Sequence, residues 1–155
     1  MCGIFASVTH NSEYDLQFLS EQGNKCSHRG PDTTRETLYQ NVNYDVFFQF
    51  HRLAINGLDE SSNQPFENEY SSLICNGEIY NYKELAKKYN IPLKTESDCE
   101  IILHLYHLLG INMISLLDGV FSFIILDRDR NMIHIGHDPL GIRSLYMCET
   151  KNGLF

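Results

Sequence analysis

The chain has 155 residues, which fits one domain with a substantial core, since a chain of about 150 residues buries roughly 68–70% of its unfolded surface. Its formal net charge of −8 argues against a nucleic-acid partner, because phosphates attract basic surfaces. No apolar run approaches the roughly 20 residues that span a bilayer, and residues 1–8 lack the features of a signal peptide. We therefore expect a cytoplasmic protein that binds neither nucleic acid nor membrane.

Hydrophobic periodicity and turn residues predict an alternation of strands and helices. In chain order, these are a strand at 4–8, a helix at about 15–25, a turn at 28–32, a β-rich run at 46–55, a strand at 72–75, helices at 82–89 and 97–109, a strand at 120–126, a turn at 127–131, and strands at 132–136 and 145–148. The runs at 46–55 and 72–75 are continuously apolar, so we expect both of their faces to be covered. Ser97 and Glu100 have the spacing of a capping box at the start of the second long helix. Adjacent hairpins and comparable helix and strand content predict an α+β layered fold with antiparallel sheets.

The five cysteines are odd in number, far apart and without a Cys-x-x-Cys pair, which indicates reduced thiols and excludes a zinc ribbon or a thioredoxin motif. Cys2 directly follows Met1 and precedes Gly3. A small second residue permits removal of Met1, after which the α-amino group of Cys2, with a pKa of about 8, can take the proton from its own thiol. Cys2 is therefore a candidate nucleophile, and the alternative is that a cysteine stands second by chance.

Asn76-Gly77-Glu78 directly follows the apolar strand predicted at 72–75. Glycine at a strand end lets the backbone approach a ligand closely. An Asn amide beside a backbone N–H is a pair of donors suited to a developing oxyanion. The alternative is a simple Asn-Gly hairpin turn.

Arg52 lies in the β-rich run at 46–55, where an inward guanidinium could pair with a carboxylate and an outward one would be a surface residue. Asp98 stands at the start of the helix predicted at 97–109. Its carboxylate could stabilise the positive helix end, and it could also receive a ligand ammonium group. His104 and His107 share a helix face with Glu100, but the surrounding stripe is core-like, so we predict ordinary helix histidines and no metal site.

Eight blocks of sequence together resemble the class II glutamine amidotransferases, the glutamine-hydrolysing domains among the N-terminal nucleophile (Ntn) hydrolases. These blocks are residues 1–4 (MCGI), 28–32 (HRGPD), 51–55 (HRLAI), 63–66 (NQPF), 76–82 (NGEIYNY), 97–100 (SDCE), 117–123 (LDGVFSF) and 138–146 (DPLGIRSLY). They occur in the family's order and cover nearly the whole chain. Residues 29–32 and 76–81 favour the asparagine synthetase branch of that family. The resemblance implies a four-layer αββα sandwich of two mostly antiparallel sheets.

The resemblance also implies a reaction, the hydrolysis of L-glutamine to glutamate and ammonia. Cys2 would attack the side-chain amide with its own amino group as the base, giving a glutamyl thioester. The side chain of Asn76 and the N–H of Gly77 would form the oxyanion hole.

The remaining candidates would hold the amino-acid part of glutamine. Arg52 would bind the α-carboxylate, and Glu78 and Asp98 would bind the α-ammonium group. The backbone near Ile55 would help to orient the amide.

The resemblance implies that the ammonia supplies asparagine synthesis from aspartate in an ATP-dependent synthetase domain or subunit. Glutamine hydrolysis itself would need no cofactor, because ATP and Mg²⁺ belong to the synthetase domain, and a homodimer is compatible with the sequence. Residues 1–155 contain no Ser-Gly-Gly phosphate loop and stop in a predicted late strand. We therefore expect a glutaminase domain that is truncated at its C-terminus. It would be either a fragment of a longer protein or a short form that needs a partner. His137 stands where the family usually has Arg, with little expected effect.

Three alternatives remain open at this point. The chain could be a catalytically silent glutamine-binding or regulatory module, in which a retained Met1 would block the base. It could be an Ntn hydrolase acting on another amide, although Arg52, Glu78 and Asp98 together suit a free amino acid better. It could also be an unstable truncation product.

Overall fold

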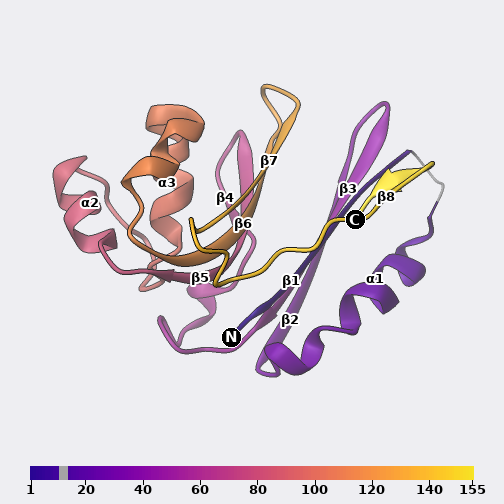
Figure 1. Cartoon of the computed structure of the whole chain (residues 1–155), viewed down its shortest axis with the longest axis horizontal. Helices are drawn as coiled ribbons and strands as arrows, with labels where there is room; N and C mark the ends of the chain where they lie inside the picture. Colours follow the sequence, from indigo (N-terminus) through magenta and orange to yellow (C-terminus); the bar gives the residue numbers. More distant parts are fainter. Residues whose placement is uncertain (11–13) are drawn as a thin grey trace. The chain divides into compact units, whose positions relative to one another are not determined.

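The structure is a computed structural model that describes residues 1–10 and 14–155. It contains two antiparallel sheets and several helices, which confirms the predicted α+β class (Figure 1). The chain divides into two compact units, unit 1 with Met1–Leu53 and Leu145–Phe155, and unit 2 with Ala54–Ser144. The four-layer arrangement of the complete sandwich stays a prediction.

Unit 1 is built on a five-stranded sheet with the strand order β2-β3-β1-β9-β8. Its elements are β1 (Gly3–His10), α1 (Leu16–Asn24), the 3₁₀ helix η1 (Ser27–Arg29), β2 (Thr33–Gln40), β3 (Tyr44–Arg52), β8 (Glu149–Thr150) and β9 (Gly153–Leu154). Strands β1 and β3 pair antiparallel over their whole length, from Gly3 opposite His51 to His10 opposite Tyr44. This register places the beginning of β1 beside the end of β3.

Helix α1 lies along the sheet of unit 1, beside β1 and β3 (Figure 1). Asp15 caps its first turn, since its carboxylate accepts a hydrogen bond from the N–H of Phe18 at 2.6 Å. Leu19 is buried against the sheet, and Gly23 approaches Gln49 so closely that a Cβ atom would lie 1.5 Å from Oε1. Residues 46–52 of β3 are all buried, as the apolar run predicts.

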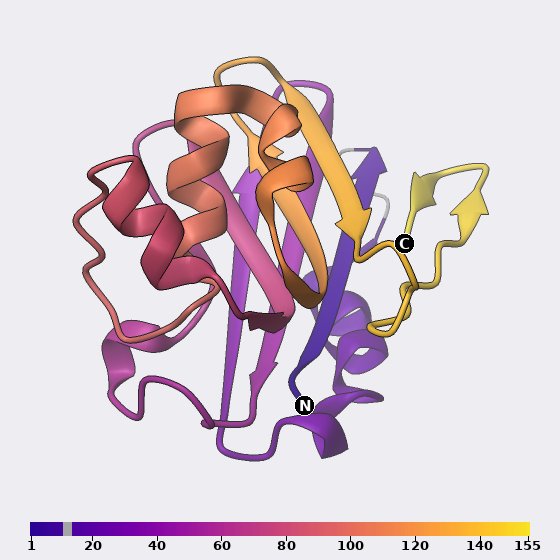
Figure 2. The same ribbon diagram turned by 60° about the vertical axis from the view of Figure 1, so that its left-hand side comes forward.

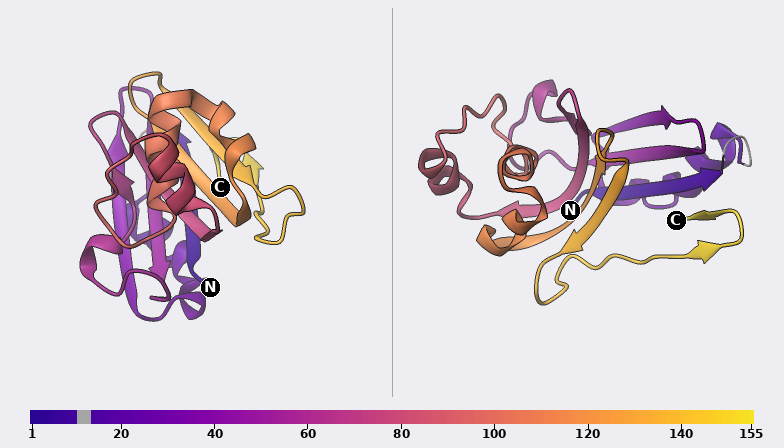
Figure 3. Two further views of the ribbon diagram at one scale, coloured as in Figure 1. Left: turned by 90° about the vertical axis from the view of Figure 1, so that its left-hand side faces the viewer. Right: turned by 90° about the horizontal axis from the view of Figure 1, so that it is seen from above.

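Unit 2 is built on a four-stranded sheet with the strand order β4-β5-β6-β7. Its elements are the 3₁₀ helix η2 (Glu60–Ser62), β4 (Phe66–Glu67), β5 (Ser71–Ile79), α2 (Tyr82–Lys88), α3 (Glu100–Leu109), the 3₁₀ helix η3 (Gly110–Leu116), β6 (Gly119–Asp127) and β7 (Met132–His137). Helices α2 and α3 cover one face of this sheet (Figures 2 and 3). Alternate residues of β5 and β6, including Leu73, Cys75, Phe121 and Phe123, form the core with α3.

The predicted capping box is wrong, because α3 begins at Glu100 instead of Ser97. The buried carboxylate of Glu100 turns back over the preceding loop, where it accepts from the N–H groups of Lys94 and Thr95 at 2.9 and 2.7 Å. The amide of Ser97 instead donates to the hydroxyl of Thr95. Glu100 therefore fixes the loop that leads into α3.

Two predictions about strands also fail. Residues 145–148, predicted as a strand, are irregular, and the next strand is the short β8, which starts at Glu149. The sequence does not predict strand β2, because residues 33–37 are all polar, 33–36 of them exposed, and show no apolar alternation. Within the described residues, no helix has both the length and the apolar character needed to cross a membrane.

Asp138 organises the loop that follows β7. Its buried carboxylate accepts four backbone N–H groups at 3.0 to 3.2 Å, those of Phe121, Leu140, Ile142 and Arg143. Burial alone raises the pKa of this carboxyl, but the four donors outweigh it and hold the pKa below its ordinary value. The stability from Asp138 is thus present above the unfolded-state pKa of about 3.9 and is lost as pH falls through the lower folded-state value.

We expect Asp138→Ala to lower the free energy of unfolding by about 3 kcal/mol at pH 7, because buried N–H groups lose a charged acceptor. Denaturant titration measures this loss, and the difference from the parent protein should shrink below about pH 4. The exposed Asp129 provides a matched control, since Asp129→Ala should change stability by less than about 0.5 kcal/mol. A loss for Asp138→Ala that is unchanged at low pH would contradict the role of its charge.

Candidate functional site

Cys2 lies immediately before β1, and its thiol faces the backbone of Leu53, the residue after β3. The N–H of Leu53 donates to Sγ at 3.4 Å, and the Sγ–H group points to the carbonyl oxygen of Leu53 at 3.7 Å. The backbone of Leu53 therefore offers the sulfur both a donor and an acceptor and holds it in place, and the thiolate is the attacking form of cysteine. The local geometry of unit 1 therefore suits a nucleophile at Cys2.

The backbone around Cys2 is held from two sides. Arg29, at the end of η1, donates from Nε to the carbonyl oxygen of Cys2 at 3.2 Å. Gly3 passes so close to the chain at Cys26 that a Cβ atom would lie 2.8 Å from its carbonyl oxygen, so a side chain would displace β1. These contacts fix the position of the thiol relative to the end of β3.

Arg52 is the last residue of β3 and is only 5% exposed, which overturns the alternative of a surface arginine. It directly precedes Leu53, the residue against Cys2 Sγ. Unit 1 thus brings the predicted nucleophile and the predicted carboxylate-binding residue to the same end of neighbouring strands in its sheet.

Asn76 and Gly77 lie inside β5, so both the predicted strand end at Cys75 and the alternative hairpin turn are wrong. They pair with Ser122 and Phe121 of β6, respectively. Asn76 is 6% exposed and lies on the sheet face opposite to Cys75, which packs into the helix-covered core. At Gly77 a Cβ atom would lie 2.4 Å from the carbonyl oxygen of Val120, so the close strand contact excludes any side chain.

Asp98 is fixed by two donors and does not cap α3. The N–H of Ile79 donates to Oδ2 at 2.5 Å and the amide of Asn56 donates to Oδ1 at 3.2 Å. Burial is the main cause that raises the pKa of the Asp98 carboxyl, the two hydrogen bonds oppose it, and the nearby charge of Glu78 raises it further. A positive group bound beside Asp98 and Glu78 would offset the cost of burying one negative charge next to another. This is the electrostatic property that a binding site for an ammonium group needs.

Glu78 is the more exposed member of this pair, with 43% of its side chain accessible. Nη2 of Arg143 lies 3.3 Å from Oε1 of Glu78. Arg143 belongs to the loop that Asp138 organises. Ile55, by contrast, lies in an irregular segment and is 61% exposed. Unit 2 therefore gathers Asn76, Gly77, Glu78 and Asp98, while Cys2 and Arg52 belong to unit 1.

Three residues in these surroundings had no predicted role. Arg29 and Gln64 lie in the sequence blocks 28–32 and 63–66, so the blocks themselves were the signal that could have found them. Asn56 lies just after a third block and gives no signal of its own. Its partner is 42 positions away along the chain, which only the fold reveals.

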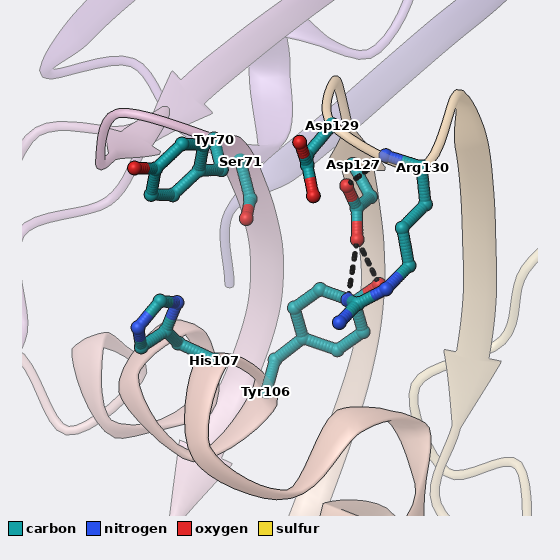
Figure 4. Close-up of a pocket in the computed structure, with 7 residues that line it drawn as sticks. All are labelled: Tyr70, Ser71, Tyr106, His107, Asp127, Asp129 and Arg130. Carbon is teal, nitrogen blue, oxygen red and sulfur yellow. Dashed lines mark hydrogen bonds and ion pairs between the residues drawn. The ribbon is translucent and has the colours of Figure 1, made fainter.

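A pocket of about 140 Å³ lies at the other end of β5 and β6, where Ser71 pairs with Asp127 (Figure 4). It is lined by Tyr70, Ser71, Tyr106, His107, Asp127, Asp129 and Arg130. The hydroxyl of Tyr106 donates to Asp127 at 2.6 Å, and burial together with this bond raises the pKa of Tyr106 to about 12. Five residues of strand separate Ser71 from Asn76, about 17 Å, so this pocket is distinct from the predicted site.

The histidines of α3 make local contacts. Nε2 of His104 lies 3.0 Å from Oε1 of Glu100, and His107 stacks on Tyr70 with ring centroids 6.3 Å apart. Within residues 1–10 and 14–155, no group of three or more His, Cys, Asp or Glu side chains is placed to hold a metal ion.

Comparison with known proteins finds a family match over the entire chain. Residues 1–155 match the family described as "Glutamine amidotransferase domain". A probable glutamine-hydrolysing asparagine synthetase of Acanthamoeba polyphaga mimivirus is 38% identical over 149 residues, covering 94% of this chain and 27% of the relative. Glutamine-hydrolysing asparagine synthetase 1 of Arabidopsis thaliana is 39% identical over 153 residues, covering 95% and 25%, respectively. The corresponding protein of Bos taurus is 40% identical over 160 residues, covering 99% and 27%, so the chain spans about a quarter of the length of these relatives.

Proposed function

Because the chain belongs to the glutamine amidotransferase domain family, we propose that it hydrolyses L-glutamine to glutamate and ammonia through a thioester on Cys2. The observation that carries this proposal is the contact of Cys2 Sγ with the backbone of Leu53, immediately after Arg52. It supports a thiol held in a fixed position next to a residue able to bind an α-carboxylate.

The reaction follows from the chemistry of these groups. The α-amino group of Cys2, exposed by removal of Met1, takes the thiol proton, and the thiolate attacks the amide carbon of glutamine. The developing oxyanion accepts hydrogen bonds from the side-chain amide of Asn76 and the N–H of Gly77. The carbon–nitrogen bond then breaks, the amino group returns the proton to the leaving ammonia, and water hydrolyses the thioester to glutamate.

The substrate's amino-acid end has matching charges. Arg52 would hold the α-carboxylate, Glu78 and Asp98 the α-ammonium, and the backbone near Ile55 the amide. We further propose that the ammonia passes to a synthetase domain or subunit that uses ATP and Mg²⁺ to form asparagine from aspartate. This part of the proposal is supported by the relatives, whose names are glutamine-hydrolysing asparagine synthetases.

The test is glutamate release from glutamine by the purified protein, with the amino terminus identified by mass spectrometry. We expect glutamate release only from chains that begin at Cys2. Asparagine, one methylene shorter, is the comparison substrate, because its amide would not reach Cys2 while both α-groups stay bound. Glutamine binding without hydrolysis by a Cys2-terminated chain would instead favour a silent binding module.

Replacement of Asp98 by asparagine should stabilise the fold but weaken the binding of glutamine. Folding raises the pKa of this carboxyl, so the native state binds a proton more tightly than the unfolded state and stability falls as pH rises above about 4. We therefore expect Asp98→Asn to increase the free energy of unfolding by about 1 kcal/mol at pH 7, since an amide oxygen can still accept from Ile79. The same change should raise KM for glutamine by about 10-fold or more, because the ammonium loses a charged acceptor.

Chemical denaturation and steady-state kinetics measure the two effects, with the exposed Asp129→Asn as the matched control. An Asp98→Asn protein that is less stable and retains its KM would contradict both assignments.

A further inference from the structure

The two edges of β5 are paired in different ways. Along one edge β6 pairs with the whole strand, from Ser71 to Ile79. Along the other edge β4 pairs only with Leu73 and Ser72. Because the N–H and C=O groups of alternate residues point to the same edge, those of residues 75, 77 and 79 point to the side of β4.

The side chain of Gln64 takes the place of a strand neighbour at Cys75. Its Oε1 accepts from the N–H of Cys75 at 2.5 Å, and its Nε2 donates to the carbonyl oxygen of Cys75 at 3.1 Å. Extending the β4–β5 register backwards from Phe66 opposite Leu73 would set residue 64 opposite Cys75. Strand β4 begins only at Phe66, so the primary amide of Gln64 supplies the donor and the acceptor that a paired backbone residue would offer to Cys75.

Further along this edge, other side chains also hold β5. The thiol of Cys99 donates to the carbonyl oxygen of Gly77 at 3.6 Å, and the carboxylate of Asp98 accepts from the N–H of Ile79 at 2.5 Å. The N–H of Gly77 thus lies between two anchored positions, and Gln64 supplies the anchor on one side. Cys75 and Gly77 are only about 7 Å apart along the strand, so a shift at Cys75 would re-aim the Gly77 N–H.

We propose that Gln64 is a positioning residue for catalysis, which clamps β5 at Cys75 and thereby aims the N–H of Gly77 at the oxyanion. Gln64 is 4% exposed and Cys75 is 1% exposed, so water does not compete for the pair. This inference rests on the proposed function, since the oxyanion arises in glutamine hydrolysis. By this proposal, Gln64 contributes to stabilisation of the transition state and not to the binding of glutamine in the ground state.

The first test is the steady-state kinetics of Gln64→Met, which keeps the volume of the side chain and removes both hydrogen bonds. Loss of an oxyanion donor lowers kcat by about 10²–10³, so a displaced donor should lower kcat by about 10- to 100-fold. KM should stay within about threefold, because the groups assigned to the α-carboxylate and α-ammonium are retained. The matched control is Gln17→Met, at an exposed position of α1, which should keep both constants.

The second test is Gln64→Glu, which keeps the shape of the side chain and makes its two hydrogen bonds to Cys75 depend on pH. A neutral carboxyl group presents an acceptor to the N–H of Cys75 and an O–H donor to its carbonyl oxygen, as the amide does. The ionised form directs a second acceptor at that carbonyl and repels it. The ratio of kcat for this variant to kcat for the parent should therefore fall as pH rises from about 5 to about 8. Dividing by the kcat of the parent removes the pH effects that both proteins share.

The outcomes separate the two proposals. If the parent protein releases no glutamate, the proposed function fails and takes the assignment of Gln64 with it. If the parent is active and Gln64→Met retains kcat, or if the Gln64→Glu ratio is independent of pH, only the assignment of Gln64 fails. A loss of kcat that is restored at low pH in Gln64→Glu supports it, because a fold damaged by the substitution would not recover in this way.

Discussion

Replacement of Cys2 by alanine should lower glutamate release from glutamine by at least about 10³-fold, while the free energy of unfolding changes by less than about 1 kcal/mol. In the proposed mechanism the thiolate forms the covalent bond to the substrate, and the α-amino group that remains in Cys2→Ala would have no nucleophile to activate. Substrate binding should survive, because Arg52, Glu78 and Asp98 are unchanged. Kinetics and isothermal titration with glutamine measure the two effects separately.

Cys148→Ala is the matched control, since Cys148 is exposed and belongs to the same unit. It should hydrolyse glutamine at the parent rate, as should a protein alkylated only at this position. Comparable activity in Cys2→Ala would remove the thioester mechanism, and a loss of glutamine binding would show that Cys2 has a structural role instead.

Asn76→Ala should lower kcat by about 10²–10³ with little change in KM, because the side-chain amide is assigned to the oxyanion and not to the ground-state substrate. The position favours a clean result, since Asn76 lies on the sheet face away from the helix-covered core and its backbone stays paired with Ser122. Asn76→Asp should be at least as damaging, because a carboxylate adds a negative charge where another develops.

The exposed Asn112 of η3 provides the control for this pair, and Asn112→Ala should leave both kinetic constants unchanged. An increase in KM with an unchanged kcat for Asn76→Ala would reassign its side chain to substrate binding. Unchanged kinetics would leave the N–H of Gly77 as the sole donor to the oxyanion.

The sequence predicts most of the fold where apolar residues repeat, as in β3, β5, β6 and α3. It fails where the stabilising contacts are polar or distant. Strand β2 consists of residues such as Thr33 and Glu36 that show no apolar pattern, and it exists because β3 offers it a paired edge. The capping box failed because the carboxylate of Glu100 is drawn to the loop at Lys94 and Thr95.

The candidate site was predictable to the extent that its residues lie in recognisable sequence blocks. Arg52 and Asp98 are both buried, although Arg52 alone could be interpreted as a surface residue and Asp98 alone as a residue that stabilises the helix end. Asn76 and Gly77 resemble a hairpin turn in sequence, but pairing with β6 and side-chain contacts from Gln64, Asp98 and Cys99 along the other edge of β5 keep them extended. Neither Gln64 nor Asn56 carries a periodic signal, because Gln64 acts through two hydrogen bonds to the backbone of Cys75 and Asn56 through one hydrogen bond to Asp98.

The strand that follows Cys2 has one partner, β9, that lies far along the chain. Residues 153 and 154 of β9 pair with Val8 and Thr9 of β1, and the 91 residues Ala54–Ser144 of unit 2 are synthesised in between. During synthesis β1 can pair with β3 early, whereas β9 reaches the other edge of β1 only after unit 2 has also emerged. The docking of β9 is therefore a later step of folding than the pairing of β1 with β3. The second edge of the strand that begins next to Cys2 is thus covered only after all of unit 2 has been made.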